Sequence, residues 1–183
     1  MLFGIICFLA SAIVSLEELP KEVLDVVAPA GEVSGSFRTV KEIPLNDGRC
    51  RKLETFGVYH LTPKKEIVWE TKKPFATLFK STTEKYIYTN IDERVEVPLN
   101  RLPAYEMFLP ALKGDFDMFL KTFDAMYKRD GENLHLLAKP KSARLKKAIK
   151  KVELDIEKSL MTLRMTFTNE IVYSIILTLG RGG

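Results

Sequence analysis

Residues 57–99 constrain the fold most, because apolar and polar side chains alternate along them in short runs. One run reads Ile67-Val-Trp-Glu-Thr71, and another reads Arg94-Val-Glu-Val97. Alternation with a period of two is typical of strands that bury one face. The breaks between runs are short enough for hairpin turns, and they fall at residues 63–66, 72–74, 82–84 and 90–93. The segment is therefore predicted to be an antiparallel meander.

Strand patterns also flank this meander. Residues 33–43 read as a first strand, and a turn at Asn46-Asp47-Gly48 returns the chain through a second strand from Cys50. Further strands are expected at residues 123–128, 132–138, 152–157, 161–168 and 171–179. Helical spacing predicts short helices within residues 16–30 and 103–123, and the basic stretch near residues 144–147 is a further helix candidate.

The number of strands restricts the architecture. About eleven consecutive antiparallel strands must curl or close, because a flat sheet of that size leaves long edges exposed. No linker long enough to separate two domains interrupts the 183 residues. We expect a mainly β (α+β) fold, in which one curled antiparallel sheet forms an incomplete β-barrel capped by short helices.

The spacing Gly57-x5-Pro63-x5-Trp69-x4-Pro74, followed by three short strands, resembles the LolA family of periplasmic carriers of outer-membrane lipoproteins. This resemblance implies an incomplete barrel with helices over one mouth and an apolar cavity for acyl chains. It also implies that cargo is accepted from an inner-membrane lipoprotein-releasing ABC transporter and delivered to an outer-membrane lipoprotein receptor, without a cofactor. The sequence departs from the family at Thr62, where a basic residue often precedes the proline, and at its short C-terminus. The lid contact and the closure of the barrel are therefore not carried over.

The candidate ligand-binding residues are the apolar side chains expected to line the barrel and its helical lid. A plain hydrophobic core is the alternative interpretation of the same residues, and a one-residue slip in register would reverse which face points inward. The candidates are Phe37, Ile67, Trp69, Leu78, Tyr86, Tyr88, Met107, Phe108, Phe116, Phe119, Leu136, Leu154, Met161, Leu163, Met165 and Phe167.

The N-terminus predicts export to the periplasm. Residues 2–14 are almost wholly apolar and no charged side chain precedes Glu17, which is typical of a secretory signal peptide. We expect a signal peptide at residues 1–15 and a carrier domain at residues 16–183, with an uncleaved anchor as the alternative. Removing the signal leaves Cys50 as the single cysteine, so neither an internal disulfide nor a metal cluster is expected.

Motifs for catalysis and nucleic-acid binding are missing from the sequence. His60 and His135 lie in strand patterns without a metal-binding or nucleophile motif around them. The basic residues 139–151 contain no aromatic side chain, so a solvated face is expected rather than a nucleic-acid site. We expect a monomeric, non-enzymatic carrier. The alternatives are an envelope regulator that senses lipids or lipoproteins through the same fold, and a secreted hydrolase whose catalytic residues come together only in the fold.

Overall fold

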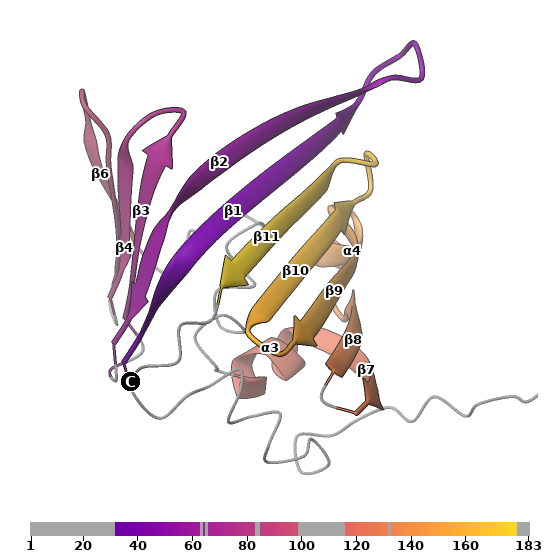
Figure 1. Ribbon diagram of the computed structural model, residues 1–183. Coiled ribbons are helices and arrows are strands. Elements are labelled where there is room, and N and C mark those ends of the chain that lie inside the picture. The colour runs from indigo at the N-terminus through magenta and orange to yellow at the C-terminus, as the bar shows by residue number, and fades with distance from the viewer. Residues whose placement is uncertain are drawn as a thin grey trace, which may run out of the picture.

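The fold is one antiparallel sheet of eleven strands in the order β6-β5-β4-β3-β2-β1-β11-β10-β9-β8-β7 (Figure 1). It is a computed structural model that describes residues 32–62, 64, 66–82, 85–98, 116–131 and 133–178. The strands are β1 (Val33–Pro44), β2 (Cys50–Leu61), β3 (Ile67–Lys73), β4 (Thr77–Ser81), β5 (Lys85–Thr89), β6 (Arg94–Pro98), β7 (Phe123–Asp130), β8 (Asn133–Pro140), β9 (Ile149–Glu157), β10 (Leu160–Phe167) and β11 (Val172–Thr178).

The sheet curls but does not close. β6 and β7 are its two edges, and the described residues form no ladder between them. The central hairpin of β1 and β2 joins two parts, the wing (β3–β6) and the body (β7–β11), and Figure 1 shows the wing turned away from the body. A register shift between Phe56 and Gly57 accompanies the bend, since a bulge increases local twist. The prediction of an incomplete barrel of about eleven strands is confirmed.

The turns follow the sequence signals. The β1–β2 turn places Gly48 at a φ of +78°, a backbone conformation that suits glycine, and Asp47 Oδ1 accepts a hydrogen bond from Arg49 N at 3.0 Å. Gly131 has the same role between β7 and β8, with a φ of +60°. The sequence predicts one strand at residues 50–56 and a second strand that begins at Gly57. In the structure these two segments form one continuous strand, β2.

Two short helices are described. α3 (Phe116–Thr122) packs Phe119 and Leu120 into the core, and α4 (Ala143–Lys146) is capped by Ser142, whose side chain accepts from Leu145 N at 3.2 Å. α4 matches the helix candidate in the basic stretch. Neither described helix is long and apolar enough to cross a membrane. The signal peptide, the helix in residues 16–30 and the remainder of residues 103–123 lie outside the described residues.

One face of the sheet carries the core. In β8 the buried and exposed residues alternate, and β9 and β10 repeat the pattern. We call this the inner face; it holds Phe37, Tyr59, Ile67, Leu154 and Met161 in one hydrophobic cluster with α3. The outer face of the body carries charged side chains instead. This one-sided burial is what period-two alternation requires.

Candidate functional site

Two glycine–aromatic pairs shape the inner face where the wing meets the body. Phe37 pairs with Gly57 across β1 and β2, and Gly35 pairs with Tyr59 two residues away. A Cβ at Gly57 would lie 2.6 Å from the Phe37 ring, and one at Gly35 would lie 2.8 Å from the Tyr59 ring. Each ring therefore lies directly over a glycine of the neighbouring strand, an arrangement that fixes register in curved sheets.

Trp69 completes this aromatic cluster from β3. Its ring centroid lies 4.0 Å from that of Phe37 and 6.1 Å from that of Tyr59. The Tyr59 hydroxyl donates to the Thr178 carbonyl at 3.2 Å, so the cluster also contacts the end of β11. Burial raises the pKa of Tyr59 to about 12 because the charged phenolate would lose water.

A row of aromatic side chains extends from this cluster across the wing. Tyr59 pairs with Trp69, Trp69 with Phe79, and Phe79 with Tyr88, so all four share the inner face. Phe79 also stacks on buried Tyr86, with the ring centroids 5.4 Å apart. Trp69 and Phe79 are half-buried, and Tyr88 is 38% exposed. The inner face of the wing therefore offers aromatic surface to a ligand.

The candidates in the body are packed against one another instead. In the core, Phe119 stacks on Phe123 with centroids 4.9 Å apart. Phe167 is half-buried against the same cluster. The other body candidates are each at most 3% exposed, and they are Leu136, Leu154, Met161, Leu163 and Met165. The structure thus brings these residues to the inner face as filled core, and a ligand would reach them only by displacing their neighbours.

The expected inward direction of Leu78 is wrong. Leu78 pairs with Glu70 and Thr89, so it lies on the outer face, and the inward position belongs to Phe79. Period-two reasoning could not separate two adjacent apolar residues, because only pairing with Trp69 decides which of them points inward. Tyr59 is a second inner-face residue missing from the expected set, although its alternation with Gly57 was visible.

Three lid candidates are not placed by the structure. Met107 and Phe108 lie outside the described residues, and Phe116 begins α3 with a side chain that is not described. Within the described residues, Lys64 is exposed in the β2–β3 turn. The lid expected from the resemblance therefore stays a prediction.

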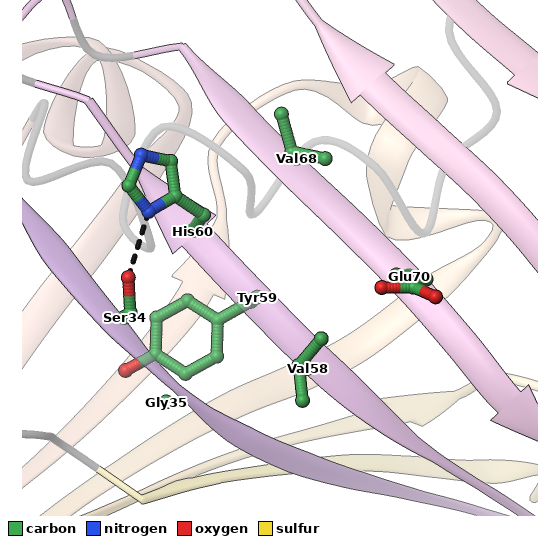
Figure 2. A pocket seen from close by; sticks show the side chains of 7 residues that line it. All are labelled: Ser34, Gly35, Val58, Tyr59, His60, Val68 and Glu70. Carbon is green, nitrogen blue, oxygen red and sulfur yellow. Dashed lines mark hydrogen bonds between the residues drawn. The ribbon is translucent and has the colours of Figure 1, made fainter.

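An open hollow of about 460 Å³ lies on the outer face of β1–β3 (Figure 2). Ser34 Oγ lies 2.7 Å from His60 Nδ1, and the other ring nitrogen of His60 lies 3.2 Å from Glu32 Oε1. A serine hydroxyl, an imidazole and a carboxylate also make up nucleophilic triads, but there the serine contacts Nε2 and the carboxylate contacts Nδ1. Here the order is reversed. These three residues are one set that the hydrolase alternative could use.

The outer face of the central hairpin is a ladder of opposite charges. Arg38 lies 2.7 Å from Glu54, and Lys52 lies 2.8 Å from Glu42. The hydrogen bond from Lys52 holds the pKa of Glu42 below its usual value. Across the described part of the chain, no three His, Cys, Asp or Glu side chains gather as metal ligands, and Cys50 is an exposed free thiol. The outer face of this hairpin thus carries two ion pairs.

Neither a protein-family model nor a curated protein matches the sequence. Among solved structures, the chain is similar to a LolA superfamily protein from Nitrosomonas europaea, at 7% identity and a TM-score of 0.49, over 93% of this chain and 96% of that one. It is also similar to the ywiB protein from Bacillus subtilis, at 11% identity and a TM-score of 0.27, over 83% of this chain and 94% of that one.

Proposed function

We propose that this protein is a periplasmic carrier that shields the acyl chains of lipoproteins on its inner face and shuttles them from the inner to the outer membrane. The observation that carries the proposal is the row of Trp69, Phe79 and Tyr88 on the wing. These side chains face inward on the same apolar surface as the body core, yet they remain partly exposed. The motif spacing that resembles the LolA family supports the choice of lipoproteins as cargo.

The free energy of covering an acyl chain is large enough to support a carrier. Covering an acyl chain is worth about 0.8 kcal/mol per methylene, so a short length of chain on an aromatic surface already binds measurably. Release must remain possible, which an open sheet permits because its edges are not paired with each other. No bond is made or broken in this function, and no cofactor is needed. The partners we propose are an inner-membrane ABC transporter that loads cargo and an outer-membrane receptor that accepts it.

Native mass spectrometry of protein expressed in a Gram-negative periplasm tests the cargo directly. We expect an acylated lipoprotein or another lipid to co-purify, to be identified by lipid extraction. A clean apo mass together with no binding of a triacylated peptide would overturn the proposal. Transfer of the bound lipoprotein to acceptor vesicles separates a carrier from a sensor, because a sensor would retain its ligand.

A matched pair of variants tests the location. Tyr88 and Leu78 are 38% and 41% exposed, but they lie on opposite faces of the wing. Tyr88→Ser should weaken binding of a fluorescent acyl probe about tenfold, since losing roughly 1.4 kcal/mol of apolar contact changes Kd by that factor. Leu78→Ser should leave the Kd unchanged. Equal losses in both variants would mean that the probe does not bind on the inner face.

A further inference from the structure

The two most exposed large apolar side chains among the described residues lie at the tips of two hairpins in the wing. Phe75, in the β3–β4 turn, is 75% exposed, and Ile91, in the β5–β6 turn, is 84% exposed. Every other exposed large hydrophobic in the described part of the chain lies between 38% and 42%. Turn positions are normally occupied by Gly, Pro, Asn, Asp or Ser. Large apolar residues at both tips therefore call for an explanation.

Both tips project from the same end of the sheet. Thr71 pairs with Thr77, so the β3–β4 turn follows at that end of the strands, and Leu78 pairs with Thr89, so the β5–β6 turn leaves from the same end. Figure 1 shows the free ends of the wing hairpins side by side. Adjacent strands are about 4.8 Å apart, so two turns separated by two strand spacings lie roughly 10 Å from each other.

Ile91 has no role in forming its turn. Asn90 Oδ1 accepts hydrogen bonds from Asp92 N at 2.9 Å and from Glu93 N at 2.7 Å, and Asn90 N donates to Glu93 O at 2.9 Å. The asparagine side chain and the backbone therefore hold the turn. Ile91 can change without loss of any of these bonds, which makes it available for contact outside the chain.

The charges beside the tips are of both signs. Lys72 and Lys73 end β3 and are exposed, while Asp92 and Glu93 are exposed in the β5–β6 turn. No described residue forms an ion pair with Lys72 or Lys73. Arg94 beside them is paired with Glu96 at 3.0 Å, so the positive and negative groups at this end of the wing balance. This end therefore matches a surface that also carries both signs. Zwitterionic lipid headgroups are such a surface.

We propose that the end of the wing that carries the β3–β4 and β5–β6 turns docks on a lipid bilayer, with Phe75 and Ile91 inserted into the headgroup and upper acyl region. Each side chain enters separately, and the lysine and carboxylate groups remain among the headgroups. The proposal goes beyond the carrier function and does not rest on it, because membrane contact is measured without cargo. A loss of acyl-probe binding would leave it unaffected.

A bilayer fits these tips better than a protein partner does. A stable protein interface needs roughly 1,200 Å² of total buried area with a continuous apolar core. The tips instead present two single side chains about 10 Å apart, with charged residues on their outer sides, at the end of β3 and before β6. A bilayer accepts isolated apolar side chains, since each gains its transfer free energy independently of the other.

Depth-dependent fluorescence quenching in the full chain tests the insertion. Trp69 is the single tryptophan, so a Trp69→Phe background carries one reporter at a time: Phe75→Trp, Ile91→Trp or, as the control, Leu160→Trp. Leu160 is 39% exposed and pairs with Thr178, at the opposite end of the sheet. With phosphatidylcholine vesicles brominated on the acyl chains, we expect quenching at positions 75 and 91 and not at 160. Equal quenching at all three positions, or none at positions 75 and 91, would overturn the proposal.

Vesicle flotation in the unaltered background gives a second readout. Phe75→Ser/Ile91→Ser should reduce the fraction bound to phosphatidylcholine vesicles at least about tenfold, since two inserted side chains are lost. Leu160→Ser should bind as the unaltered protein does, and binding should persist at high salt, because opposite charges cancel at the edge. Unchanged flotation of the double variant refutes docking by the tips. Loss of a dimer in sedimentation analysis without any vesicle binding would mean that a second copy is the occupant, which also refutes it.

Discussion

Gly57→Ala is the variant that most directly tests how the inner face is built. The φ of Gly57 is not in the left-handed region, so its backbone conformation does not require glycine; the space around it does. A Cβ there would lie 1.9 Å from the Glu70 carbonyl oxygen and 2.6 Å from two atoms of the Phe37 ring. Neither contact can exist, so β2 must move away from β3 and the Phe37 ring must shift from its place against Trp69.

The loss of stability in Gly57→Ala depends on which atoms must move to relieve the two contacts. Overpacking that side-chain rotation can relieve costs about 1–3 kcal/mol, and the Glu70 contact is with backbone, which cannot rotate away. We therefore expect Gly57→Ala to lower the free energy of unfolding by about 3 kcal/mol, at the upper end of that range. For a domain of this size, such a loss lowers Tm by about 6–12 °C.

Gly48→Ala is the control, because a Cβ at Gly48 meets nothing within 4 Å and only the positive φ of +78° is unfavourable. It should cost about 1–2 kcal/mol. Denaturant unfolding followed by circular dichroism measures both variants, and near-ultraviolet spectra report the environment of Trp69. If Gly57→Ala were no less stable than Gly48→Ala and left the Trp69 spectrum unchanged, the close approach of Phe37 and Glu70 to Gly57 would be refuted.

Three further predictions concern the core, alkaline pH and hydrolysis. Leu154→Ala, at a side chain 1% exposed, should lower the free energy of unfolding by about 2–5 kcal/mol in denaturant titrations, and a loss below 1 kcal/mol would mean that the body core is not packed as described. Burial raises the pKa of Tyr59 to about 12 from 10.0, so the folded chain holds this proton more tightly; the stability it contributes is complete below about pH 10 and is lost as pH rises towards 12. Tyr59→Phe should make that fall shallower in unfolding curves taken across this window, and identical slopes would count against a buried phenol. Ser34→Ala should leave turnover of nitrophenyl esters unchanged, whereas loss of a measurable activity would favour the hydrolase alternative.

The strands could be predicted from the sequence because their signals are local. Alternation with a period of two, together with the Asn-Asp-Gly turn before β2 and the glycine at residue 131, located the strands and most of their ends, except that β2 was predicted as two strands. The apolar character of the inner-face residues was equally visible. Such signals depend only on neighbours in the chain, so one sequence suffices to read them.

Which side chains lie on the inner face of the wing could not be predicted, because it depends on pairing between distant residues. Leu78 and Phe79 are both apolar, and the choice between them follows from the register of β4 against Trp69. Glycine at residue 57 reads as the start of a strand, but its packing role appears only when Phe37, twenty residues earlier, lies over it. The contact between Ser34 and His60 likewise joins two strands.

The sequence by itself therefore determined that this chain forms a one-sided antiparallel sheet with an apolar face, because alternation and turn chemistry act over a few residues. Only the tertiary structure decided which aromatic side chains stay exposed on that face. It also decided that Phe75 and Ile91 project together from one end of the wing. The physical reason is that register and curl are set by packing across strands, where a shift of one residue exchanges the two faces.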